Sequence, residues 1–379
     1  MTMKVRIALA GLGFGAEFIP IYQAHPDAEL VALCQRNEHS LTTIADRFQV
    51  PRRFTSYDEL VADPDIDAVH INTPIPDHAA HTIAALEAGK HVACTVPMAT
   101  TLDELRAIVA AAKASGRNYM MMETVVYSRE YLHVRSLVDD GTIGRIQFLR
   151  GWHFQEMAGW PGYWEGLPPM HYATHAVSPV LALAGALAES VVCHGSGRIS
   201  PELTAHYGSP FAVESALIAL RNSNVSAEIA RSLFETAHEY VEGFTVFGDR
   251  ATFEWEQTQD AGHVLHVGEK PRRVEVPDFA HLLPAEVARF TTRGVYDEDN
   301  EHLSFVQGSG HGGSHPHLAH EFVRSIVEGR PAAIDAEVAA NWTAVGICAH
   351  ESAMRGGERV RIPDFAGELA AGKQAEAVI

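Results

Sequence analysis

The sequence is poor in cysteine and lacks any long hydrophobic run. Its 379 residues contain four widely separated cysteines, Cys34, Cys94, Cys193 and Cys348, and none of them forms a CxxC pair. Such spacing favours reduced thiols over a disulfide framework. No apolar stretch reaches membrane-spanning length, and residues 1–13 are typical of a strand and not of a signal peptide. The sequence therefore predicts a cytoplasmic protein with no membrane partner.

Basic residues are also scarce. Lysine and arginine together number 29 against 48 acidic residues, which gives a formal net charge of −19. A nucleic acid would be repelled by such a surface unless a local basic patch intervened, and the two PRR segments at 51–53 and 271–273 are short and isolated. We expect no nucleic-acid partner. The length and the 46% hydrophobic content predict two globular domains.

The first third of the chain alternates between strand-like and helix-like segments. Apolar strand patterns occupy residues 4–10, 29–37, 66–74, 91–97 and 118–125. Helical patterns occupy residues 14–25, 40–48, 77–89 and 101–116. This alternation predicts a doubly wound parallel sheet of the Rossmann type, α/β in class, over residues 1–123.

The rhythm changes in the remainder of the chain. Long strand-like stretches follow one another closely at 145–155, 214–234, 240–256 and 263–277. Helical patterns with glycine stop signals return at 317–329 and 336–357. We expect residues 124–379 to form an α+β domain with a large, mostly antiparallel open sheet.

A glycine-rich turn follows the first expected strand. Residues 10–18, AGLGFGAEF, contain Gly11-x-Gly13-x-x-Ala16, with Phe14 and Gly15 inside the turn. A dinucleotide site needs a tight turn at the first glycine, close approach of the second to the pyrophosphate, and a small third residue for helix packing. Its position at the first strand–helix junction predicts nucleotide binding.

The second expected strand ends in Gln35-Arg36 where NAD-binding folds usually place an acid. Gln35 can hydrogen-bond a ribose hydroxyl. Arg36 can pair with a 2′-phosphate or stack on adenine, or it is simply a solvated loop residue. These two residues favour NADP slightly and do not exclude NAD.

Further motifs resemble the Gfo/Idh/MocA superfamily of sugar and inositol oxidoreductases. They are INTPIPDH at 71–78, AGKHVACTVP at 88–97 and DDGTIGRIQFLRG at 139–151. The resemblance implies that Asn72, Thr73, Pro74 and His78 line the cofactor, together with Thr95, Val96 and Pro97. Dehydrogenases of the superfamily carry a lysine at the place of Val96, and valine can neither donate, accept nor titrate. Acid–base chemistry must therefore come from elsewhere.

One branch of the superfamily, the NAD-dependent glycosidases, resembles this chain across both expected domains. The α-N-acetylgalactosaminidases carry E-V-P at the lysine position, and their other motifs are similar to residues 120–127, 173–179 and 311–315. The sulfoquinovosidases with the same chemistry are a second candidate group. The resemblance implies NAD as a recycled cofactor and a sugar glycoside as the small-molecule substrate. Oxidation at C3, elimination across C1 and C2, water addition and re-reduction would give net hydrolysis.

Histidine and tyrosine suit the proton transfers of such a reaction because general bases work best with a pKa near the working pH. The candidates are His175, Tyr127 and His171. If residues 171–178 are helical, His171 and His175 share one face. Glu123, at the end of an expected strand, is placed to hold the nicotinamide ribose or carboxamide, or is a buried structural acid.

Residues 152–164 are rich in aromatic side chains. Trp152, Trp160 and Trp164 can stack on a sugar, although packing is an equally good use. An anionic sugar would suit Arg145, His153, Arg231 and His311. The His171–His175 spacing, with His311 or His315, also resembles a metal site, but no H-E-x-x-H pattern adjoins it and we expect no metal.

Two alternatives to the glycosidase remain. One is an NAD(P)-dependent sugar or inositol dehydrogenase in which histidine takes the role of lysine. The other is a catalytically silent nucleotide-binding regulator. The resemblance also implies a homo-oligomer that associates through the open face of the second-domain sheet.

Overall fold

A computed structural model describes residues 4–258, 260–292 and 309–367. The chain forms two compact units. The first comprises Met1–Ala99, Asp103–Arg129 and Asp278–Ala339, and the second comprises Thr100–Leu102, Glu130–Pro277 and Ala340–Ile379. Apart from the three residues Thr100–Leu102, the chain enters the second unit after Arg129, six residues beyond the predicted border at residue 123. The sequence patterns do not predict the return of Asp278–Ala339 to the first unit.

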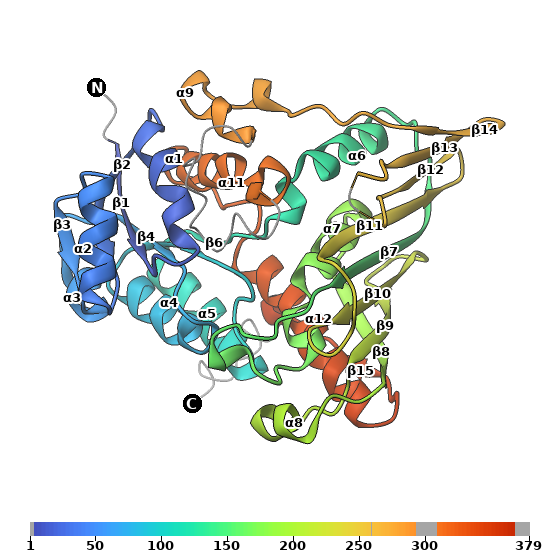
Figure 1. The fold of residues 1–379 in the computed structure, drawn as a ribbon. Helices are drawn as coiled ribbons and strands as arrows, with labels where there is room; N and C mark the ends of the chain where they lie inside the picture. Colours follow the sequence, from blue (N-terminus) through green and yellow to red (C-terminus); the bar gives the residue numbers. More distant parts are fainter. Residues whose placement is uncertain (1–3, 259, 293–308, 368–379) are drawn as a thin grey trace, which may run out of the picture. The chain divides into compact units, whose positions relative to one another are not determined.

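The first unit is built on a parallel sheet of six strands in the order β3-β2-β1-β4-β5-β6 (Figure 1). The strands are β1 Val5–Ala10, β2 Ala28–Cys34, β3 Arg52–Phe54, β4 Ala68–Ile71, β5 His91–Cys94 and β6 Tyr119–Met121. β1 lies in the middle, and its side chains from Ile7 to Ala10 are fully buried. This strand order reverses direction at β1, the point where doubly wound sheets hold their ligands. The Rossmann-type prediction is confirmed.

Helices of the first unit connect these strands. They are η1 Gly15–Phe18, α1 Ile19–Ala24, α2 Glu38–Arg47, α3 Tyr57–Ala62, η2 Ile75–Asp77, α4 His78–Glu87, α5 Leu102–Ser115 and η3 Val125–Tyr127. The helix expected at 14–25 is split into η1 and α1, with Pro20 in the first turn of α1. β3 and α3 have no counterpart among the expected elements, because the three residues of β3, RRF, carry no apolar pattern.

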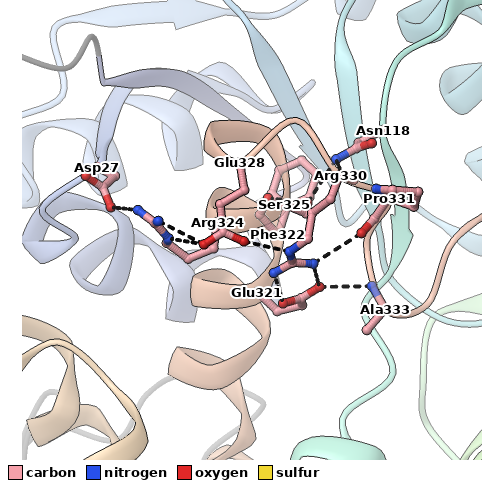
Figure 2. Close-up of polar contacts among 10 residues, drawn as sticks. All are labelled: Asp27, Asn118, Glu321, Phe322, Arg324, Ser325, Glu328, Arg330, Pro331 and Ala333. Atoms are coloured by element: carbon pink, nitrogen blue, oxygen red, sulfur yellow. Dashed lines mark hydrogen bonds and ion pairs between the residues drawn. The ribbon is translucent and has the colours of Figure 1, made fainter.

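The segment that returns to the first unit contains η6 Ala280–Leu282, α9 Ala285–Ala288, η7 Arg289–Thr291 and α11 Ser309–Val327. Ion pairs hold the end of α11 in place (Figure 2). Arg324 bonds Asp27 at 2.7 Å, and Arg330 forms a two-pronged pair with Glu321 at 2.6 and 2.7 Å. Asn118, just before β6, donates to the Arg330 carbonyl at 2.8 Å. These contacts explain how so distant a segment joins the first unit.

The second unit contains a sheet of nine strands in the order β14-β13-β12-β11-β7-β10-β9-β8-β15. Their bounds are β7 Ile146–Phe154, β8 Ala188–Ser196, β9 Val213–Leu220, β10 Ser226–Ser232, β11 Val241–Gly248, β12 Ala251–Glu254, β13 Val264–Val267, β14 Lys270–Arg273 and β15 Val360–Arg361. β7 and β10 pair in parallel, and the other pairs that the structure describes are antiparallel. The predicted mostly antiparallel second sheet is confirmed.

Helices cover one face of this second sheet. α7 Thr174–Ala184 packs on β7, β10 and β11 (Figure 1). The other helices are α6 Arg129–Asp139, α8 Pro201–Tyr207 and α12 Ala336–Met354, with short turns η4 Gly162–Trp164 and η5 Pro169–Tyr172. The opposite face carries a hollow of about 260 Å³ lined in part by Arg150, Trp152 and Phe154. Within the described residues, no helix combines the length and apolar character needed to cross a bilayer.

Several histidines are buried without charge. Burial lowers the pKa of His25, His263 and His317 to about 4 and that of His70 to about 3. Each side chain is at most 9% exposed. Their ordinary pKa is 6.5, so between pH 6.5 and pH 4 the unfolded chain binds more protons than the folded chain. The stability they contribute is complete above pH 6.5 and is lost as the pH falls toward 4.

We therefore expect the free energy of unfolding to fall steeply between pH 6.5 and pH 4.5. Each histidine contributes at most about 1.4 kcal/mol per pH unit in that window. Urea titrations across this range measure the slope. His317→Leu should reduce this slope by up to about 1.4 kcal/mol per pH unit, because one buried histidine is lost. Replacement of the exposed His39 by leucine should leave the slope unchanged. An equal slope in wild type and His317→Leu would contradict the prediction.

Candidate active site

The glycine turn after β1 packs against Asn72 and leaves an open space at its middle. Gly11 has φ +86°, and a Cβ there would lie 2.3 Å from the Asn72 carbonyl oxygen. A Cβ at Gly15 would lie 2.8 Å from the Asn72 side-chain nitrogen. At Gly13, by contrast, no described heavy atom lies within 4 Å of such a Cβ. The turn therefore offers the close backbone approach at Gly13 that a pyrophosphate requires.

The end of β2 supports this turn. The Leu12 amide donates to Gln35 Oε1 at 3.4 Å, and the Gly11 amide donates to the Cys34 carbonyl at 2.9 Å. Arg36 is exposed, and Ala16 is 3% exposed beneath the turn. The residues predicted for the nucleotide thus meet at the carboxyl ends of β1 and β2.

His78, the first residue of α4, links the loops that follow β4 and β5. Its Nδ1 lies 2.8 Å from the Pro97 carbonyl oxygen, and its Nε2 lies 2.8 Å from the Thr73 carbonyl oxygen. Both partners only accept, so both ring nitrogens must donate and the ring is an imidazolium. Burial lowers the pKa of His78, but the neighbouring Cys94 and the two carbonyls outweigh it and raise the pKa to about 9. His78 therefore fixes the loops that carry Thr73 and Pro97.

Val96 occupies the loop after β5. Its side chain is 9% exposed, and the preceding Thr95 is held by its amide at 3.0 Å from the Ile71 carbonyl oxygen. This position supplies an apolar contact and no titratable group. The loop after β5 is thus anchored to β4 through Thr95 and has no ammonium group at position 96.

Glu123 and Tyr127 lie on a turn after β6. Glu123 is fully buried, and its Oε1 accepts from the Val125 amide at 3.0 Å. The η3 turn that this contact begins ends at the half-buried Tyr127. Glu123 therefore positions the turn that carries Tyr127.

His311 and His315 begin α11 in the first unit. The ring of Phe14 lies 6.1 Å from that of His311 and 5.4 Å from that of His315. The fully buried His315 has its Nδ1 2.9 Å from Glu17 Oε2. The structure therefore places both histidines beside the glycine turn, and His315 already has a buried carboxylate as its neighbour.

Polar side chains in the second unit form a row across neighbouring strands. In register, Glu214 of β9 opposes Arg231 of β10, Arg231 opposes His153 of β7, and His153 opposes Glu242 of β11. Residues directly opposite each other on paired strands point to the same face of a sheet. The row Glu214–Arg231–His153–Glu242 therefore crosses one face of the sheet, and His175 of α7 meets it there.

Arg231 is fully buried and donates to main-chain and side-chain oxygens around it. Its Nε bonds the Tyr172 carbonyl at 2.9 Å, Nη1 bonds the His153 carbonyl at 2.9 Å, and Nη2 bonds Gln155 Oε1 at 3.0 Å. A third carbonyl, that of Ser232, accepts from Nη1 at 2.6 Å. Burial lowers the pKa of Arg231 to about 10, so it stays charged at neutral pH. These bonds indicate a positioning role.

His175 lies in the first turn of α7 and is 2% exposed. Its Nε2 is 3.3 Å from the Tyr172 hydroxyl, and its Nδ1 is 4.0 Å from Glu242 Oε2. The Tyr240 hydroxyl donates to the same carboxylate oxygen at 2.7 Å. A histidine between a phenol and a carboxylate can accept a proton and be stabilised as the imidazolium. Tyr172–His175–Glu242 is therefore the strongest proton-transfer group in the second unit.

The prediction that His171 and His175 share a helical face is wrong. His171 lies in η5, and Ala173, with φ −101° and ψ 4°, separates that turn from α7. The His171 ring lies 5.1 Å from the His350 ring, whose Nδ1 is 2.7 Å from Glu214 Oε1. Burial, and secondarily His350, lower the pKa of His171 to about 3. His171 is therefore a weak base at neutral pH.

The predicted substrate residues of the second unit do not all meet. The Trp164 ring lies 4.8 Å from that of Tyr172 and 5.8 Å from that of Trp160. The Trp160–Trp164 pair therefore lies beside Tyr172, whose hydroxyl contacts His175. Trp152 lines the hollow on the opposite face of the sheet from His153. Arg145, just before β7, pairs with Asp249 at 2.8 Å and lies eight residues from His153, about 26 Å along an extended strand.

Tyr172, Tyr240 and Glu242 are not among the residues predicted from the sequence. The one available signal for Glu242 is an acid within the apolar strand segment YVEGFTVFG. Nothing in the sequence indicates that Glu242 opposes His153, because strand register depends on pairing between distant segments.

The fold and the glycine turn define a protein of the Rossmann class. Comparison with known families agrees. Residues 5–123 match the oxidoreductase family with an NAD-binding Rossmann fold, Gfo/Idh/MocA, and residues 299–369 match the C-terminal domain of glycosyl hydrolase 109. The resemblance to the superfamily and to its NAD-dependent glycosidase branch is thereby confirmed.

Individual relatives show both chemistries of the superfamily. A glycosyl hydrolase family 109 protein of Shewanella baltica is 33% identical over 199 residues, which is 46% of this chain and 43% of the relative. A trans-1,2-dihydrobenzene-1,2-diol dehydrogenase of Bos taurus is 30% identical over 152 residues, covering 40% of this chain and 45% of the relative. This chain thus matches less than half the length of either relative.

The fold itself extends over nearly the whole chain. A levoglucosan dehydrogenase, solved in complex with NADH and levoglucosan, superposes with a TM-score of 0.78 and covers 95% of this chain and 100% of that chain. At 21% identity this likeness establishes the fold alone.

The two glycines of the turn give a matched pair of variants. Gly13→Val should leave the free energy of unfolding nearly unchanged but weaken NAD binding at least about tenfold, because the valine side chain would fill the open space at the middle of the glycine turn. Gly11→Ala should lower the free energy of unfolding by about 1–3 kcal/mol or more, because of its positive φ and the contact with Asn72. Calorimetric titration and urea unfolding measure both. Undiminished NAD binding by Gly13→Val would contradict the assignment of this open space to the cofactor.

Proposed function

We propose that this protein is an NAD-dependent glycosidase that hydrolyses a sugar glycoside by transient oxidation at C3. The observation that carries the proposal is that one chain has both Val96, at a position where superfamily dehydrogenases have lysine, and the Tyr172–His175–Glu242 group in its second unit. The C-terminal match to glycosyl hydrolase 109 and the relatives of that name support it.

The first unit would bind NAD through the glycine turn and the loops that His78 joins. When bound, NAD would take a hydride from sugar C3 and return it at the end of the cycle. Gly13 gives the pyrophosphate access to the backbone, and Asn72 supports the turn from below. We propose NAD over NADP because the family matched by residues 5–123 is described as NAD-binding, which outweighs the slight preference for NADP that Gln35 and Arg36 suggest.

The second unit would supply proton transfer. His175 would accept the proton released by the sugar, Glu242 would stabilise the imidazolium, and Tyr172 would hold the ring by its Nε2. The half-buried Trp160, whose ring lies 5.8 Å from that of Trp164, offers an aromatic surface on which a sugar can stack. From the first unit, we assign Tyr127 as a further proton-transfer candidate.

Oxidation of the sugar C3 hydroxyl to a ketone, which bound NAD would supply and later reverse, would acidify the C2 hydrogen. Removal of the C2 proton expels the aglycone from C1, and the aglycone leaves with a proton. Water then adds its hydroxyl to C1 and its proton to C2, and the hydride and a proton return to C3. The sum is hydrolysis of the C1–oxygen bond with no net oxidation.

The open face of the second sheet supports a proposal that the protein forms homo-oligomers. This face carries the hollow lined by Trp152 and Phe154, and Leu217 of β9 is 57% exposed. Apolar side chains gathered on an exposed sheet face are typical of subunit contacts.

A sugar dehydrogenase is the second candidate. The 30% identity to the Bos taurus diol dehydrogenase supports a dehydrogenase activity without indicating a sugar, and His175 would then replace the missing lysine. The two candidates differ in the fate of the reduced cofactor.

We expect aglycone release from a panel of glycosides without net accumulation of NADH. In deuterated water the released sugar should carry deuterium at C2, because the elimination route removes that hydrogen and returns one from solvent. Mass spectrometry of the sugar and absorbance of NADH measure both results. Net NADH would instead support the dehydrogenase, and released sugar without deuterium would exclude the elimination route.

His175→Ala should lower turnover at least about 100-fold, the low end for loss of a general base. Tyr172→Phe keeps the ring and removes the hydroxyl that contacts Nε2, so its loss should be smaller. His266→Ala, at an exposed pair with Glu254, is a control that should turn over normally. Near-normal turnover by His175→Ala would remove it from the mechanism.

A further inference from the structure

We propose that the second unit binds a divalent transition-metal cation, of which Zn²⁺ is the best suited, at His153, His175 and Glu242. Each of these residues offers one ligand atom, and the three atoms all lie within 4.8 Å of one another. The set is independent of the His171–His175 spacing in the sequence. It brings together a strand, a helix and a second strand that lie far apart along the chain.

The spacing of the donor atoms suits a cation. Zn²⁺ binds histidine nitrogen at about 2.0–2.1 Å and carboxylate oxygen at about 2.0–2.2 Å, so tetrahedral ligand atoms lie about 3.3–3.5 Å apart. His175 Nδ1 and Glu242 Oε2 are 4.0 Å apart. Since all three donor atoms lie within 4.8 Å of one another, side-chain movements that bring the widest pair closer by up to about 1.4 Å would close the site.

Neighbouring groups hold the ligands from outside. His175 would use Nδ1 for the metal while its Nε2 contacts the Tyr172 hydroxyl, and Tyr240 bonds the Glu242 carboxylate. Metal-binding histidines almost always engage their second ring nitrogen in this way. Arg231 bonds the main-chain carbonyls of His153 and Tyr172 and so ties together the segments that carry both histidines.

The donor set indicates the class of metal. Two imidazoles and one carboxylate suit zinc and other first-row transition metals, whereas Ca²⁺ and Mg²⁺ prefer oxygen ligands alone. Three protein ligands leave a fourth position open, as in zinc sites that bind water or substrate. His153 and His175 are at most 2% exposed, and Glu242 contributes the negative charge.

The test uses the full-length protein, stripped with a chelator, without nucleotide or sugar. We expect calorimetric titration with Zn²⁺ to show one equivalent bound, and Co²⁺ to give the visible absorption of a four- or five-coordinate ion. Loss of an outer-shell partner alone costs about 10- to 100-fold in affinity, so loss of a ligand in His153→Ala or Glu242→Gln should cost at least that much.

Glu242→Gln keeps the shape of the side chain, so it remains informative if His153→Ala fails to fold. His266→Ala removes an exposed histidine beside Glu254 and should leave one equivalent bound. Zn²⁺ binding that survives in Glu242→Gln, or no binding by folded wild type, would overturn the proposal. Because no sugar is present, either result leaves the proposed glycosidase activity untouched.

Discussion

The second unit depends on one buried charge. Burying a guanidinium is costly unless its donors are satisfied, and Arg231 satisfies them with carbonyls on β7, β10 and η5 and with Gln155. Because two of these carbonyls belong to His153 and Tyr172, the same bonds fix the strand that carries one histidine and the turn that leads to the other. The positions of His153 and Tyr172 therefore depend on Arg231, which is itself fully buried.

The first unit uses a charge in a similar way. His78 lies between two carbonyl acceptors and is held as a cation, so it draws the loops after β4 and β5 together. Val96 belongs to one of these loops. A lysine there would add a second cation near a buried imidazolium, whereas valine adds only apolar contact. The loop can thus keep its form while the titrating groups of the protein lie elsewhere.

The parallel sheet could be predicted because each strand and helix has its own periodic pattern and each junction its own turn signal. β3 and α3 were not predicted because short segments with charged residues carry no such pattern. The return of Asp278–Ala339 to the first unit could not be predicted either. It depends on ion pairs such as Arg324–Asp27, which join residues far apart in the sequence and leave no local pattern. The glycine turn after β1 could be predicted from one short segment, since its residues are close in sequence.

The grouping of His153, His175 and Glu242 could be predicted only in part. His175 and His153 stand out in the sequence, but their meeting with Glu242 depends on the register of β7 against β11. His171 shows the opposite error, since a spacing of four residues places two side chains together only if the helix is continuous. Here the backbone at Ala173 interrupts the helix, and the His171 ring lies beside the His350 ring instead.

The same geometry links the two roles proposed for His175. A proton and a metal cation compete for the lone pair at Nδ1, and Glu242 stabilises either of them. With a cation bound at Nδ1, the ring could no longer accept a proton there, and Nε2 would be fixed as the donor to Tyr172. Tyr172 would then be the group left to exchange protons. If both proposals hold, the occupancy of His175 Nδ1 would decide whether His175 or Tyr172 acts as the base.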